Sequence, residues 1–128
     1  MTGPELIEAA RNAARNAYCK YSNFPVGAAL TSDDGRLFAA CNVENASYGL
    51  TICAERATIF AAVAAGTKRI SRMAVSCSAG DLARPSSLMP CGACRQVIAE
   101  FATPDFVLFI DGVGERTLDQ ILPSPFAP

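Results

Sequence analysis

Apolar residues recur at helical spacing in three segments of the chain. The first runs from Glu5 to Tyr18 and places its apolar positions on one face. The second, Ala54 to Ala65, is apolar almost all round, which is typical of a helix covered on several sides, and Gly66 is placed to end it. The third, Cys91 to Ala102, carries a single apolar stripe. The pattern therefore predicts three helices.

Four shorter apolar runs have the length of strands. Val26 to Leu30 and Leu37 to Cys41 flank a turn that ends in Asp34-Gly35, a hairpin signal, so we expect these two strands to pair antiparallel. Met73 to Cys77 predicts a third strand. Phe106 to Ile110 is uniformly apolar, which is typical of a central strand that is covered on both faces.

The predicted order of elements is helix, strand, strand, helix, strand, helix, strand. Strand–helix–strand units need crossover connections, and these build a mixed sheet with some parallel strands and with helices on both faces. We therefore expect an α/β fold, a three-layer αβα sandwich. The chain has 128 residues, without an internal repeat or a linker, so residues 1–128 are predicted to form a single domain.

The composition is that of a globular protein. Hydrophobic residues make up 51% of the chain, charged residues 18%, and the net charge is -1. No basic excess exists to hold a phosphate backbone, which argues against a nucleic-acid partner. The longest apolar run, Ile59 to Ala65, is too short to span a membrane, and the N-terminus lacks the pattern of a signal peptide. We expect a cytoplasmic protein without a membrane partner, with reduced thiols.

The chain contains no histidine. This excludes the Ser-His-Asp and Cys-His arrangements of nucleophilic catalysis, and every metal site with an imidazole ligand. Any chemistry must depend on other side chains, and the six cysteines are the first candidates.

Three cysteines stand at the predicted N-terminal ends of helices. Cys53 precedes the second helix, while Cys91 and Cys94, three residues apart, lie on one face at the start of the third. Free N–H groups and the positive helix end stabilise a thiolate there. A crossover fold can bring the two helix ends together. Three protein ligands with one open position are typical of a catalytic zinc, whose fourth ligand is water.

Two further residues fit such a site. Glu55, two residues after Cys53, is near enough to take a proton from the water and pass it on, which is general acid-base catalysis. Three thiolates and one zinc carry a net charge of about -1. Arg56 is placed to offset this charge by a hydrogen bond to a thiolate.

These residues alone leave other interpretations of the site open. Cys91 and Cys94 have the spacing of a redox dithiol. A fourth ligand from the remaining cysteines would make a structural zinc module, although core packing is the usual role of a free cysteine. Glu55 also fits a first-turn acid favoured by the helix dipole. The remaining cysteines are Cys19, Cys41 and Cys77.

Four motifs of the chain resemble the small, homotetrameric, zinc-dependent cytidine deaminases, and they occur in the same order. They are Tyr21-Ser22-Asn23-Phe24-Pro25-Val26-Gly27-Ala28-Ala29-Leu30, Asn42-Val43-Glu44-Asn45-Ala46-Ser47-Tyr48-Gly49, Cys53-Ala54-Glu55-Arg56 and Pro90-Cys91-Gly92-Ala93-Cys94-Arg95-Gln96. The similarity runs from the first predicted helix to Leu122-Pro123. Two departures are Lys20, where many relatives have proline, and a longer segment from Ser78 to Met89.

The resemblance implies an activity and a cofactor. The activity is hydrolytic deamination of cytidine and deoxycytidine, with release of ammonia, through attack of zinc-bound hydroxide at C4, a reaction of pyrimidine salvage. It implies one zinc per chain, bound by Cys53, Cys91 and Cys94, and proton transfer by Glu55. A related activity, deamination of a cytosine-containing antibiotic nucleoside, is the alternative, and the motif from Asn42 to Gly49 argues against it.

The resemblance also implies how the substrate is held. The expected roles concern the sugar, the base and a neighbouring subunit of a homotetramer with shared active sites. Asn42 and Glu44 would bind the ribose hydroxyl, Phe24 would pack on the sugar or base, the backbone of Ala54 would contact the pyrimidine edge, and Tyr48 and Phe126 would reach a neighbour's site.

Overall fold

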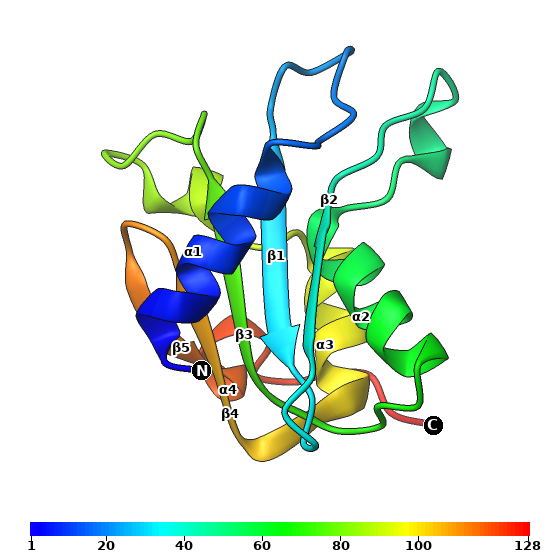
Figure 1. Cartoon of the computed structure of the whole chain (residues 1–128), viewed down its shortest axis with the longest axis vertical. Helices are drawn as coiled ribbons and strands as arrows, with labels where there is room; N and C mark the ends of the chain where they lie inside the picture. Colours follow the sequence, from blue (N-terminus) through cyan, green and yellow to red (C-terminus); the bar gives the residue numbers. More distant parts are fainter.

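A computed structural model describes residues 1–128 and contains one mixed sheet flanked by helices (Figure 1). The five strands lie in the order β2-β1-β3-β4-β5. The elements are α1 (Gly3–Ala14), β1 (Val26–Thr31), β2 (Leu37–Cys41), η1 (Tyr48–Leu50), α2 (Ala54–Ala64), β3 (Ile70–Cys77), η2 (Pro85–Leu88), α3 (Gly92–Phe101), β4 (Ala102–Ile110), β5 (Gly114–Thr117) and α4 (Leu118–Ile121), where η1 and η2 are 3₁₀ turns.

The strand directions agree with crossover connections. β3 and β4 pair in parallel, and all other neighbours pair antiparallel, so β2, β3 and β4 point the same way. α2 connects β2 to β3, and α3 connects β3 to β4. Both helices therefore begin at the edge of the sheet where these strands end, which is where α/β proteins usually bind ligands.

Alternate residues of the central strands face two separate cores. On one face, Leu30, Met73 and Leu108 pack with residues of α2, α3 and α4. On the other face, Ala29 and Phe109 pack with residues of α1. This two-residue period is the expected pattern of a sheet covered on both sides. The predicted αβα sandwich is confirmed, and Figure 1 shows α1 on the opposite side of the sheet from α2 and α3.

Two glycines occupy positions that other residues would not fit, one because of close packing and one because of its backbone angle. A Cβ atom on Gly27 would lie 1.8 Å from the carbonyl oxygen of Ala10, so only glycine lets α1 pack this closely against β1. Gly66 has a φ of 104°. Its N–H donates to the Val63 carbonyl, and the next N–H donates to the Ala62 carbonyl, which is the Schellman motif that ends α2. The predicted helix end at Gly66 is confirmed.

The first helix is displaced from its predicted range. It starts at Gly3, because Thr2 and Glu5 form a capping box there and a proline occupies the first turn. It ends at Ala14. The apolar spacing that continues to Tyr18 belongs to the following loop, not to the helix. Arg11 on this helix makes two hydrogen bonds to Asp111, of 2.7 and 2.6 Å, which join α1 to the end of β4 and lower the pKa of that carboxyl.

The C-terminal part of the sheet also differs from the prediction. β4 begins at Ala102 and includes Pro104, which lacks an N–H for a strand ladder. The register of β3 and β4 is irregular between Ile70 and Arg72, so Pro104 falls where the regular pairing is interrupted. β5 and α4 were not predicted as separate elements. None of the helices combines the length and the apolar composition needed to cross a membrane.

Candidate active site

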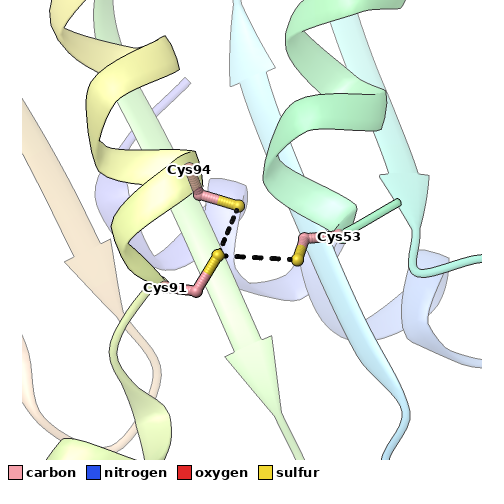
Figure 2. A group of neighbouring side chains, drawn as sticks. All are labelled: Cys53, Cys91 and Cys94. Carbon is pink, nitrogen blue, oxygen red and sulfur yellow. Dashed lines mark hydrogen bonds between the residues drawn. The ribbon is translucent and has the colours of Figure 1, made fainter. Parts of the chain in front are cut away.

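The N-terminal ends of α2 and α3 bring three cysteines together. Cys53 and Cys91 are the N-cap residues of α2 and α3, and Cys94 lies in the first turn of α3. The sulfur of Cys91 is 3.7 Å from that of Cys53 and 3.4 Å from that of Cys94, and all three lie within 4.8 Å of one another. Figure 2 shows the three side chains pointing into the space between the two helices.

The sulfur positions fit a zinc ion. Zinc–thiolate bonds of about 2.3 Å in tetrahedral geometry separate two sulfurs by roughly 3.8 Å. The two observed separations are near this value, so the cluster is compatible with one zinc ion. No fourth cysteine or carboxylate belongs to the cluster, which leaves the open position of a catalytic site. This argues against the structural zinc module, and the participation of Cys53 argues against a simple dithiol.

Arg56 lies against the cluster. Its Nη2 donates to the sulfur of Cys53 at 3.3 Å, the contact expected from the sequence. The neighbouring Cys94 thiol, followed by the hydrogen bond from Arg56, lowers the pKa of Cys53 to about 5. The pKa of Cys94 is raised, because the neighbouring Cys53 sulfur and its own burial disfavour a second thiolate. Cys53 therefore ionises before Cys94, and a bound cation would displace the proton of Cys94.

Glu55 is almost completely buried beside these thiols. The residue is only 4% exposed. Burial raises the pKa of its carboxyl to about 7, and the negative charge of Cys53 contributes in the same direction. A carboxyl with this pKa can both accept and donate a proton near neutral pH, as general acid-base catalysis requires. Burial of this degree is more than a first-turn acid needs for its contact with the helix dipole.

A pocket of about 360 Å³ opens next to the cluster and contains seven of the predicted site residues. Its lining includes the catalytic and metal candidates and the candidates for binding sugar and base. These are Phe24, Asn42, Glu44, Cys53, Ala54, Glu55 and Cys91. Cys94 lies behind them, without solvent exposure. Residues that are far apart in the sequence thus form a single concave site.

Asn42 and Glu44 also hold the loop that carries Phe24. The Asn42 side chain accepts from the N–H of Val26 and donates to the carbonyl of Phe24, both at 2.9 Å. The Glu44 carboxylate accepts from the N–H groups of Tyr21 and Ser22, at 3.0 and 3.1 Å. It also accepts from the Ser22 hydroxyl, which is the main reason why the pKa of Glu44 is lowered.

Tyr48 and Phe126 do not enter the pocket of their own chain. Tyr48 is 75% exposed and packs edge-on against Tyr21, with the ring centres 5.9 Å apart. Phe126 is 78% exposed, and only its backbone carbonyl is held, by the Gln96 side chain at 3.2 Å. Their expected role in a neighbouring subunit's site stays a prediction.

The pocket also contains residues that the sequence did not indicate. They are Ser22, Val26, Thr51, Cys77, Ser87 and Met89. Cys77, expected in the core, packs partly against the main core and partly borders the pocket, and burial raises the pKa of its thiol to about 12. Cys19 and Cys41 are half-buried and lie outside both cores, so the expected core packing is wrong for these two.

The fold and the site together define a class of protein. Three cysteines around a metal position, with a glutamate that is not a ligand, are the arrangement of zinc-dependent deaminases. Residues 3–110 match the family model of the cytidine and deoxycytidylate deaminase zinc-binding region, and the chain belongs to this family.

Individual relatives agree with this assignment. The chain is 41% identical to a cytidine deaminase of Sporosarcina psychrophila over 127 residues, which cover 96% of this chain and 90% of the relative. It is 48% identical to a cytidine deaminase of Mycobacterium tuberculosis, over 91% of this chain and 84% of the relative. The crystal structure of a cytidine deaminase from Mycobacterium tuberculosis superposes with a TM-score of 0.86 at 39% identity, over 100% of this chain and 99% of that one.

The geometry of the cluster predicts one zinc ion per chain, bound by three thiolates. Replacing Cys53, Cys91 or Cys94 by alanine should reduce the zinc content of the purified protein to near zero, because two thiolates do not complete the site. Elemental analysis measures this directly. Cys19→Ala is the matched control and should retain one zinc. Full zinc retention in Cys91→Ala would contradict the assignment.

Proposed function

We propose that this chain catalyses the hydrolytic deamination of cytidine to uridine, with release of ammonia, and of deoxycytidine to deoxyuridine in the same way. The main observation is a buried carboxyl, Glu55, that shares one pocket with a three-thiol cluster and with the polar groups of Asn42 and Glu44. The relatives that are named cytidine deaminases, at 41 and 48% identity, support this reaction.

Cys53, Cys91 and Cys94 would hold the zinc ion, which supplies Lewis-acid activation of water when bound. Together with the Cys94 thiol, the hydrogen bond from Arg56 favours the ionised form of the Cys53 sulfur. In the reaction a bond forms between the water oxygen and C4 of the base, and the bond between C4 and the exocyclic nitrogen breaks. Glu55 accepts a proton from the water and delivers it to N3. It later accepts the remaining proton of the hydroxyl on C4 and transfers it to the departing amino group, which leaves as ammonia.

The remaining pocket groups orient the nucleoside. Asn42 and Glu44 hold the ribose hydroxyl through side-chain donor and acceptor groups that are not used in hydrogen bonds to the loop before β1. Phe24 packs against the sugar or base. Ala54 is the first residue of α2, and the N–H groups of a first helical turn have no partner within the helix. Its backbone therefore suits the polar edge of the pyrimidine.

We also propose that residues 1–128 form one domain and that the protein acts in pyrimidine salvage in the cytoplasm. A metal site made only of thiols requires reduced cysteines, and all six are free. Neither the charge nor the pocket calls for a nucleic-acid or membrane partner.

Glu55→Gln tests the role of the carboxyl. The substitution keeps the size and polarity of the side chain but removes the titrating group, so the turnover of cytidine should fall by roughly 10² to 10⁴ or more. The loss of the ultraviolet absorbance of cytidine measures the rate, and elemental analysis should still find zinc. Glu100→Gln, on the exposed side of α3, is the control. Near-normal turnover by Glu55→Gln would refute this mechanism.

The sugar contacts predict discrimination between nucleoside and free base. A hydrogen bond to a charged group contributes about 1.5 to 3 kcal/mol, so Glu44→Ala should reduce kcat/KM for cytidine by about tenfold or more. Cytosine, which lacks the ribose, should be a very poor substrate. Ser22→Ala is the control, because it weakens the loop contact of Glu44 but keeps the carboxylate. Equal loss in both variants, or turnover of cytosine comparable with that of cytidine, would contradict the proposed contact.

We further propose a homotetramer in which Tyr48 and Phe126 complete a neighbour's site. Large apolar side chains stay exposed on α2 and near the pocket, where a partner chain would cover them. Phe60 is 49% exposed, Val63 37% and Leu50 64%, in addition to the exposed rings of Tyr48 and Phe126. Closed symmetry is the usual way in which soluble chains bury such surface.

The tetramer predicts a mass of four chains by light scattering after size exclusion. Removal of residues 126–128 should raise the KM for cytidine more than it lowers the thermal unfolding temperature, because the tail carries no core residue. Replacing Phe60 by glutamate should split the assembly. A monomer that is fully active at micromolar concentration would contradict the shared site.

A further inference from the structure

One wall of the pocket carries no group that the proposed chemistry uses. It is made of Cys77, at the end of β3, together with Ser87 and Met89 from the segment between β3 and α3. Cys91 lies two residues after Met89 and lines the same pocket, so the wall is continuous with the metal cluster.

The position of Met89 is fixed by its neighbours. Leu88 is 2% exposed in the main core, and Pro90 is also buried. Met89 lies between them with extended backbone angles, a φ of -80° and a ψ of 152°. The half-buried side chain of Met89 packs partly against the main core and also lines the pocket.

The segment before Met89 is held by its own hydrogen bonds. The hydroxyl of Ser87 accepts from the N–H of Asp81 at 3.0 Å and donates to the carbonyl of Arg84 at 2.8 Å. Both its donor and its acceptor function are thus used within the loop. Cys77 faces the pocket with a neutral thiol that donates weakly to the Leu88 carbonyl, at 3.9 Å. Met89 is then the adaptable apolar side chain of this wall.

The ring geometry of cytosine places one edge against this wall, if the proposed function is correct. In the ring, N1 carries the sugar and lies opposite C4, and N3 lies opposite C6. With N3 at Glu55 on α2 and the sugar at Asn42 and Glu44, the edge made of C5 and C6 faces away from α2. Figure 2 shows that α3, which begins where this wall ends, faces α2 across the cluster.

We propose that Met89 determines which substituents on C5 of the cytosine ring the enzyme accepts. The side chain is flexible and apolar, so it suits a small apolar substituent such as a methyl group and resists a larger one. This inference rests on the proposed function and adds a specificity-determining residue to it.

The experiment compares cytidine with 5-methylcytidine in the zinc-loaded enzyme, through the ratio of their kcat/KM values. Met89→Ala should raise the ratio of 5-methylcytidine to cytidine, and Met89→Phe should lower it. One methylene in an apolar pocket changes kcat/KM by roughly 10- to 200-fold, so the two variants should differ by at least about tenfold. Leu82→Ala is the matched control, because Leu82 is in the same segment but is 65% exposed and outside the pocket.

The outcomes separate the two proposals. Opposite changes of the ratio in Met89→Ala and Met89→Phe, with no change in Leu82→Ala, support the role of Met89. A ratio that stays within twofold of the original in both Met89 variants, while cytidine is still turned over, overturns this role and leaves the proposed function intact. A zinc-loaded original enzyme that turns over neither nucleoside overturns both.

Discussion

Three thiols within 4.8 Å of one another can ionise together only if nearby positive charge offsets the repulsion between the thiolates. The fold provides such charge in two forms, the N-terminal ends of α2 and α3 and the guanidinium of Arg56. Both helices must therefore begin at the same edge of the sheet, side by side on one face. The crossovers from β2 to β3 and from β3 to β4 meet this requirement.

The sheet then determines where the substrate loops lie. The strands that precede α2 and α3 end at this edge, so the segments that follow them surround the cluster. Asn42 and Glu44 follow β2 and hold the loop before β1 with their side-chain hydrogen bonds. Their role in the fold and their proposed role in binding are thus coupled. A substitution at either position changes the placement of Phe24 as well as the contact with a ligand.

Periodicity and linear motifs were enough to predict the elements that form the core and most of the site. The predicted bounds of β1, β2, α2 and α3 agree with the structure within about one residue, because each element has its own apolar pattern or end signal. β5 and α4 have only four residues each, too few for a period to develop, although Asp111-Gly112 is a turn signal before β5. Met89 was missed for another reason. Its place in the pocket wall depends on packing against the main core, which is a property of the folded chain.

The burial of Glu55 connects the balance of charges around the three thiols to function. A buried carboxylate next to a thiolate is costly, and the carboxyl responds with a pKa of about 7. The same surroundings keep Cys94 and Cys77 protonated and leave Cys53 as the ionised sulfur. Without metal, the charge of Arg56 therefore balances that of the Cys53 thiolate, which it contacts. A divalent cation can enter only as thiol protons leave. The site that holds a metal and the site that transfers protons are thus one electrostatic unit. The thiolate, the carboxyl and the guanidinium all come from the first turn of α2 and its N-cap residue, within Cys53-Ala54-Glu55-Arg56.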